Sequence, residues 1–174
     1  MGVYLAGATE KGIAWAVNSG TRVLTSALTT SLLYIRNLDG QRKIPIGKIF
    51  LGGSQAAHWT IRVNVDLDSG AALANQLAVQ NLDASWAGNF GSGRPLNGVF
   101  RGGNDGGLAN GGIVILHYWT ISFQTLPIEL DGAIRLGEDD NIEIRCEPNV
   151  DGTFSANVFL WQRQEGPEEG AQWV

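Results

Sequence analysis

The chain has one cysteine, two histidines and little charge, and each shortage excludes a class of protein. The single Cys146 allows no disulfide within the chain, and its place in an alternating strand pattern favours a core position. Asp, Glu, Lys and Arg make up 17% of the residues, where about 25% is usual. The net charge of -5 argues against nucleic acid as a partner, because phosphate binding needs clustered Lys and Arg.

Residue patterns that carry catalysis are missing as well. His58 and His117 lie far apart in the sequence, so a histidine-based metal site or acid–base pair would need the fold to bring them together by accident. The chain contains neither a Gly-x-Ser-x-Gly elbow nor a phosphate-binding loop motif. We therefore expect no enzyme, no catalytic residues, no metal and no cofactor.

Long apolar runs are also lacking. The longest, from Gly112 to Phe123, is interrupted by His117 and is too short to span a bilayer. The first residues lack the basic region of a signal peptide. We expect synthesis in a cytoplasm.

What the chain does contain is a strong β pattern between Ala133 and Gln162. Ile142, Ile144 and Cys146 alternate with charged residues, and Val158 to Trp161 is an unbroken apolar run. An Asp-Gly turn separates the two segments. We predict two strands at the centre of a β-sandwich, with three polar side chains on a face that meets water or a neighbouring subunit: Glu143, Arg145 and Asn157.

Further strands are predicted on both sides of a short helical pattern. Asp39-Gly40 between two apolar runs predicts a hairpin, and residues 58–68 and 113–123 read as strands. Leu73 and Leu77 lie four apart, which suits a helix. The expected fold is all-β, a two-sheet β-sandwich or single jelly roll of about eight to ten strands, with at most one short helix near residues 70–82.

The predicted domain has flexible margins. Residues 13–163 form the expected jelly roll, which residues 1–12 precede as an N-terminal arm and residues 164–174 follow as an acidic tail. Residues 91–112 contain nine glycines and are predicted to be a flexible loop, although Val99 to Arg101 could form a brief strand within it.

Aromatic residues and the two ends supply the candidate binding residues. Trp59 and Trp119, if exposed, would stack on sugar rings; the alternative is that Trp86, Trp119 and Trp161 pack between the sheets. Trp173 has no local core to join and would dock on another subunit. The candidate subunit interface comprises five residues: Val3, Tyr4, Leu5, Trp173 and Val174.

Taken together, these features resemble the small single jelly-roll major capsid proteins of tailless, membrane-containing icosahedral bacteriophages of the Thermus type. The resemblance rests on the length, the arm from Met1 to Gly12, the low-charge body, the glycine loop and the closing strands I-E-I-R-C and N-V-F-L-W-Q. Trimeric fibre heads and tumour-necrosis-factor-like modules also end on strands of this kind.

The resemblance implies a structural protein of the virion, made in the host cytoplasm. It would form a homo-oligomer, a dimer or higher, and would tile with a larger second capsid protein over an internal viral membrane, with exchange of terminal segments between subunits. The alternative function is a carbohydrate-binding module or phage receptor-binding head. Trp59 and Trp119 would then carry the sugar contact.

Overall fold

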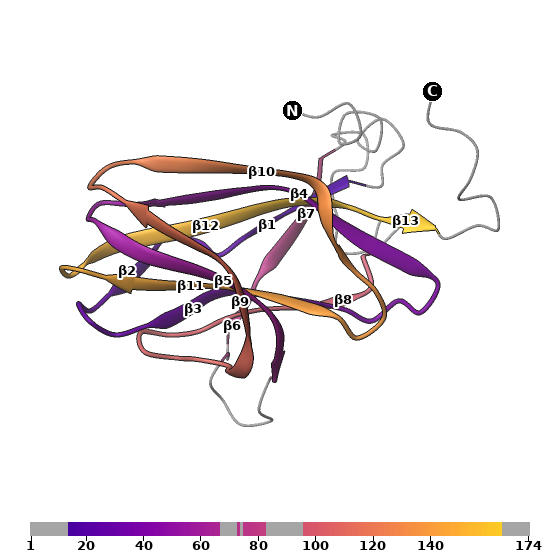
Figure 1. Ribbon diagram of the computed structural model, residues 1–174, viewed down its shortest axis with the longest axis horizontal. Helices are drawn as coiled ribbons and strands as arrows, with labels where there is room; N and C mark the ends of the chain where they lie inside the picture. Colours follow the sequence, from indigo (N-terminus) through magenta and orange to yellow (C-terminus); the bar gives the residue numbers. More distant parts are fainter. Residues whose placement is uncertain (1–13, 67–72, 74, 83–95, 165–174) are drawn as a thin grey trace.

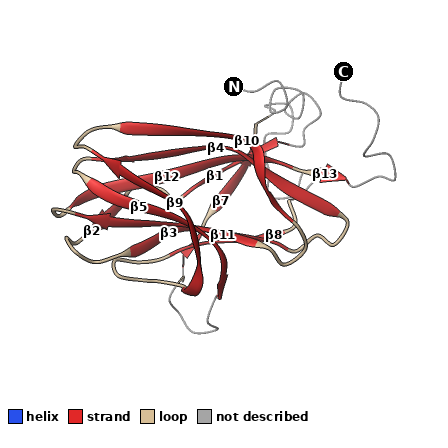
Figure 2. Cartoon of the chain, in the orientation of Figure 1, coloured by secondary structure: helices blue, strands red, loops and turns tan. Residues whose placement is uncertain are grey.

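Strands make up the regular structure of the residues that are described. The computed structural model describes residues 14–66, 73, 75–82 and 96–164. Within these ranges the chain forms thirteen strand segments and no helix (Figure 2). The expectation of an all-β fold is therefore confirmed.

The first sheet has seven strands in the order β10-β4-β12-β1-β7, with β2 beside β12 and β13 beside β4. Its strands are β1 (Ala14–Asn18), β2 (Arg22–Leu24), β4 (Arg42–Gly53), β7 (Ala78–Asn81), β10 (Thr125–Leu136), β12 (Gly152–Trp161) and β13 (Arg163–Gln164).

The second sheet has six strands in the order β6-β8-β3-β11-β5-β9 and packs face to face on the first (Figure 1). Its strands are β3 (Thr30–Asn37), β5 (Ala57–Asp66), β6 (Asn75–Gln76), β8 (Gly98–Gly102), β9 (Asn110–Thr120) and β11 (Asn141–Pro148).

The strand pairing is that of a jelly roll. Moving inward from both ends of the domain, β1 pairs with β12, β3 with β11, β4 with β10 and β5 with β9, all antiparallel. Such nested pairs form when one long hairpin is wrapped into two sheets. The four connections β2–β3, β4–β5, β9–β10 and β11–β12 then lie at one end of the sandwich, on the left in Figure 1.

The predicted central strands do occupy the centre, one in each sheet. In the second sheet β11 lies between β3 and β5, and in the first sheet β12 lies between β4 and β1. Ile142, Ile144 and Cys146 of β11 are fully buried, as are Val158 and Leu160 of β12. They belong to one core cluster, so the Asp-Gly link joins strands that face each other across the core.

The predicted hairpin at Asp39-Gly40 is wrong, because β3 and β4 belong to different sheets. The side chain of Asn37 holds this corner: its Nδ2 donates to the carbonyl oxygens of Arg42 at 2.8 Å and of Leu136 at 3.0 Å. The Asp-Gly pair reverses the chain as expected. Hydrogen bonds from Asn37 to the start of β4 and to the end of β10 hold the chain where it enters the opposite sheet.

The predicted helix near residues 70–82 is also wrong for the part that is described. Residues 75–76 form β6 in the second sheet, and residues 78–81 form β7 in the first, so this segment crosses between the sheets. Leu77 joins the main core, whereas Leu73 joins a small cluster with Tyr34, Val65 and others. Leu73 and Leu77, four residues apart, are therefore buried in two separate clusters and do not share one face of a helix.

The predicted glycine loop is partly strand. Gly98–Gly102 forms β8, which includes the brief strand expected at Val99 to Arg101, and β9 begins at Asn110. Residues 91–95 lie outside the described residues. At Gly103 a Cβ atom would lie 2.5 Å from the carbonyl oxygen of Gly107, so this tight loop requires glycine there.

Core packing can be tested with a matched pair of isoleucines. Ile144→Ala on β11 removes fully buried methyl groups and leaves a cavity, so the free energy of unfolding should fall by about 2–5 kcal/mol. Ile113→Ala on β9, where the side chain is 61% exposed, should cost about 0.5 kcal/mol or less. Urea unfolding measures both, and equal losses would contradict the described burial.

Candidate functional site

The end of the sandwich that carries four connections is low in charge. Residues 25–29, 54–56, 121–124 and 149–151 link the strands there, and among them only Asp151 is charged. Its Oδ1 accepts the backbone N–H of Ser26 at 2.7 Å, so that carboxylate is already engaged. Cores of protein interfaces are similarly depleted of charged residues.

Backbone hydrogen bonds tie these connections together. Ala27 N–H donates to the Pro148 oxygen at 3.0 Å, and Asn149 N–H donates to Ala56 at 3.0 Å. Phe123 N–H donates to the Gly53 oxygen at 3.0 Å. The end surface is therefore held in place by the sandwich beneath it.

Large apolar side chains project from this end. We call the following six residues the apolar end; their exposed fractions are Val23 77%, Leu28 45%, Trp119 67%, Ile121 70%, Phe123 84% and Val150 57%. Isolated exposed apolar residues are ordinary on a monomer, but these six lie toward the same end of the sandwich, and exposed apolar residues that gather in this way mark an interaction surface.

Phe123 has an unusual backbone conformation as well as high exposure. Its φ is +59°, in the left-handed region, which costs a residue with a side chain about 1–2 kcal/mol. Its ring gains little burial in the monomer. The strained conformation and the exposed ring together point to a contact outside the monomer.

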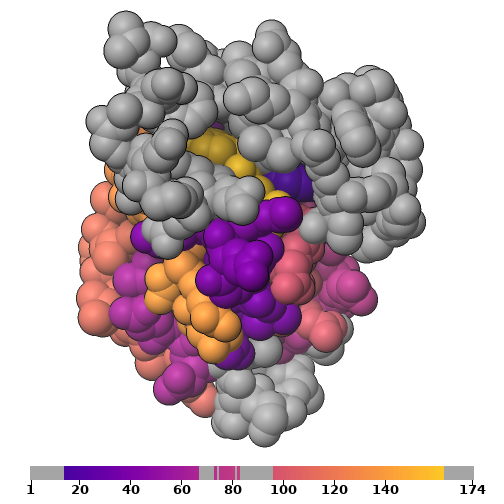
Figure 3. Space-filling view, turned by 90° about the vertical axis from the view of Figure 1, so that its right-hand side faces the viewer, coloured from indigo at the N-terminus to yellow at the C-terminus, as the bar shows by residue number. Residues whose placement is uncertain are grey.

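The opposite end of the sandwich is acidic. The β3–β4 connection contains Asp39, and the β10–β11 connection contains Glu138, Asp139 and Asp140. These two connections lie side by side, purple and orange in Figure 3, and Asp139 N–H donates to the Asn37 oxygen at 2.9 Å. Carboxylates therefore gather at this end. At the other end Asp105, Asp151 and Glu147 reach the β2–β3 connection, and each accepts a hydrogen bond from a residue there.

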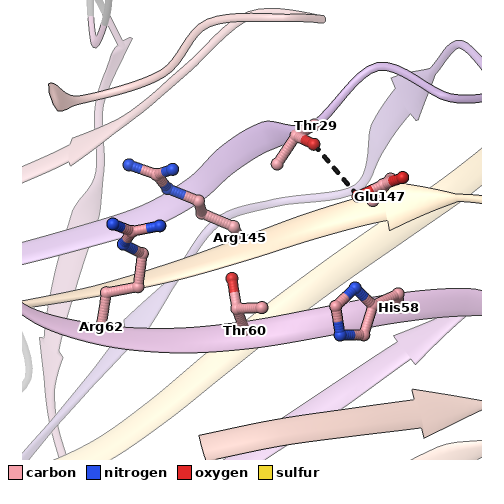
Figure 4. A pocket seen from close by; sticks show the side chains of 6 residues that line it. All are labelled: Thr29, His58, Thr60, Arg62, Arg145 and Glu147. Atoms are coloured by element: carbon pink, nitrogen blue, oxygen red, sulfur yellow. Dashed lines mark hydrogen bonds between the residues drawn. The ribbon is translucent and has the colours of Figure 1, made fainter. Parts of the chain in front are cut away.

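A small polar pocket lies on the outer face of the second sheet (Figure 4). Its volume is about 170 Å³, and Figure 4 shows two guanidinium groups extending side by side at one end of it. Six residues line the pocket: Thr29, His58, Thr60, Arg62, Arg145 and Glu147.

The two arginines hold the start of β9. Arg62 Nη2 donates to the Gly112 oxygen at 2.8 Å, and Arg145 Nη2 donates to the Ala109 oxygen at 2.6 Å. Arg145 Nε also lies 2.7 Å from Glu143 Oε2. These contacts give both side chains a structural role at the pocket wall.

The prediction that Glu143 faces water or a neighbour is wrong. Its side chain is fully buried, because residues 103–109 fold over the outer face of β3 and β11. Ser31 Oγ and Arg145 supply its partners. A buried carboxylate is tolerated where it is paired and hydrogen-bonded in this way.

The fold brings the two histidines together, which was not predicted from the sequence. His58 Nε2 and His117 Nδ1 are 3.1 Å apart, so one ring donates to the other. The ring of Trp119 stacks on His58 with centroids 4.3 Å apart. Among the described residues, no group of three or more His, Cys, Asp or Glu side chains is placed to hold a metal ion.

The two candidate sugar-stacking tryptophans differ in exposure. Trp59 is fully buried, and its Nε1 donates to Thr120 Oγ1 at 2.9 Å, so it offers no face to a sugar. Trp119 is exposed, which corrects the alternative that it packs between the sheets. Trp161 is buried in a small cluster with Ala14, and Trp86 lies outside the described residues.

Sequence reasoning missed Ile121 and Phe123 of the apolar end because it extended the strand to Phe123. The strand β9 ends at Thr120, and residues 121–124 form a turn in which Gln124 N–H donates to the Ile121 oxygen. Apolar side chains in a turn between strands have no sheet face to cover, and that signal could have identified them.

The terminal interface residues lie outside the described residues: Val3, Tyr4, Leu5, Trp173 and Val174.

Cys146 has the core position that the sequence predicted. Burial raises the pKa of its thiol, and the Glu147 carboxylate adds to the shift. The thiol therefore stays protonated at neutral pH and is a structural side chain.

Comparisons with family models, with curated proteins and with solved structures found no match. The described residues contain no helix with the length and apolar character that crossing a membrane requires. Fold and surface define an antiparallel jelly roll with an apolar end.

The buried ion pair can be compared with an exposed one. Arg145→Met leaves Glu143 buried without its charge partner, so we expect a loss of about 3–5 kcal/mol in unfolding free energy. Arg36→Met breaks an exposed pair with Asp139 and should cost about 1 kcal/mol or less. Guanidinium unfolding of both variants measures the two losses. A smaller loss of unfolding free energy for Arg145→Met than for Arg36→Met would contradict the buried pairing of Arg145 with Glu143.

Proposed function

We propose that this protein is a structural subunit of a virus shell, and that it works by self-association and by tiling with a second, larger capsid protein. The observation that carries the proposal is the apolar end. It places six large exposed apolar side chains at one end of the sandwich, and four of them lie on connections whose single charged residue is Asp151: Leu28, Ile121, Phe123 and Val150.

Burial of this surface between subunits supplies the driving force. Apolar area removed from water contributes about 25 cal/mol per Å², and aromatic side chains such as Trp119 and Phe123 contribute the largest areas. A jelly roll also suits this role, because viral capsid domains commonly use the architecture. The fold hosts other functions as well, so the surface and not the fold carries the argument.

Substitutions at the β9–β10 turn test the apolar end. Phe123→Gly combined with Ile121→Ser should lower the average mass in size-exclusion chromatography with light scattering, because it removes two exposed apolar side chains. Glycine accepts the positive φ of residue 123, so the free energy of unfolding should not fall by more than about 1 kcal/mol.

Leu38→Ser serves as the control, since Leu38 is 40% exposed but lies on the β3–β4 connection at the acidic end. An unchanged mass for the double variant, or an equal decrease for the control, would reject the apolar end as the contact surface. Electron microscopy of particles from the source tests the shell itself. A regular shell that contains the chain supports the proposal, and its absence from the shell refutes it.

A second candidate function is carbohydrate binding, which the exposed ring of Trp119 favours. Trp119 stacks on His58, and His58 also lines the polar pocket. Hydroxyls of Thr29 and Thr60 and the guanidinium of Arg62 provide hydrogen-bonding groups at the same place. An aromatic platform beside convergent polar groups is typical of a small-ligand site.

A glycan panel separates the two functions. If the protein binds sugar through this platform, Trp119→Ala should lower the affinity for any glycan that the wild type binds by about tenfold or more, because ring stacking is lost. The Phe123→Gly variant, which leaves the pocket intact, should bind as the wild type does. Binding that survives the loss of Trp119, or no binding to any glycan, excludes this candidate.

A further inference from the structure

The main strand orders of the two sheets end on four outer edges, and the sequence protects three of them. The strands β6 and β7 are two and four residues long, too short to template another chain. The edge strand β10 is longer but carries Pro127, exposed charges at Glu129 and Asp131, and a register shift after Glu129. Proline, charge and bulges are the usual devices that stop edge-to-edge pairing.

The fourth edge, β9, lacks proline and charge along residues 113–120, and its one irregularity is a register shift against β5 between Val114 and Leu116. Its residues 113–120 are I-V-I-L-H-Y-W-T, without proline and without Asp, Glu, Lys or Arg. One side of β9 pairs with β5, and no described strand pairs with the other side. Ile113 is 61% and Ile115 38% exposed. A long, uncharged, β-prone edge would aggregate in solution if nothing covered it.

We propose that β9 pairs antiparallel with β9 of a second copy of this chain, across a two-fold axis, and so joins two second sheets into one continuous sheet. The inference rests on the proposed function and names the subunit contact through which assembly begins. Main-chain hydrogen bonds along the edge would supply directionality, and the exposed isoleucines would supply apolar contact.

The occupant is a second copy because β9 is complementary to itself. In a two-fold antiparallel pair, two identical strands run in opposite directions. A charged residue near the axis would then lie close to the same charged residue of the other copy and be repelled by it. Residues 113–120 carry none of the four charged residue types, so no such repulsion arises. The other long edge, β10, would bring Glu129 and Asp131 of both copies together and is unsuited to the same pairing.

A cysteine scan tests the symmetry directly. In two-fold antiparallel pairing one residue lies opposite itself, with Cα atoms about 4.5–5.5 Å apart, which a disulfide can bridge. A residue two positions from the axis lies about 13 Å from its own copy, beyond disulfide reach. Single cysteines are introduced in turn from Ile113 to Trp119 in the full chain and oxidised, and dimers are quantified on non-reducing gels.

The expected result is one maximum in crosslinking, with at least about a tenfold decrease two residues to either side. Wild-type protein, whose Cys146 is fully buried, should give no dimer. Among the cysteine variants in which Ile113 and Ile115 are unchanged, the one that crosslinks most is then given Ile113→Lys and Ile115→Lys. These two lysines should abolish the disulfide-linked dimer. Ala133→Lys, an exposed position on the other edge strand β10, should leave it unchanged.

No maximum, or equal crosslinking at every position, overturns the β9 pairing. If light scattering still shows oligomers in that case, the proposed self-association stands and only this contact fails. If the wild type is a monomer at every concentration, both fail.

Discussion

The structure depends on the burial of the inward faces of β11 and β12 against each other. These neighbouring strands lie at the centres of opposite sheets, and Ile142, Ile144, Val158 and Leu160 join one core from both sides. A three-residue connection links these two central strands, and earlier strands pair on either side of each: β3 and β5 with β11, and β1 and β4 with β12. The nested pairing of the jelly roll follows from that arrangement.

The jelly-roll topology also determines which charged residues lie at each end of the sandwich. The four connections at one end contain Asp151 as their only charged residue, and Asp105 of the β8–β9 connection hydrogen-bonds to Thr25 beside them. The connections at the other end include Asp39 and a run of three carboxylates. The outer face of the second sheet is partly covered by residues 103–109, which bury Glu143. Among the described residues, three surfaces have the features of an interaction site: the apolar end, the β9 edge and the small polar pocket.

Period-2 patterning predicted the sheets well and the connections poorly. Trp59 lies in phase with Ile61, so the strand pattern could have placed it inside. On β9 apolar residues occupy both faces, and no pattern distinguishes the exposed Trp119 from a core residue. Asp39-Gly40 specifies a chain reversal, but the choice of sheet depends on Asn37 and its distant partners. The histidine pair and the pocket arise from strand register, which one sequence does not determine.

The central claim is that the exposed surfaces of this jelly roll are covered by other subunits in its working state. Sedimentation velocity of the full chain over a range of concentrations tests this claim most directly. The account predicts that the average mass rises above the 18.6 kDa of one chain as concentration increases. A constant mass of 18.6 kDa at every concentration would contradict it.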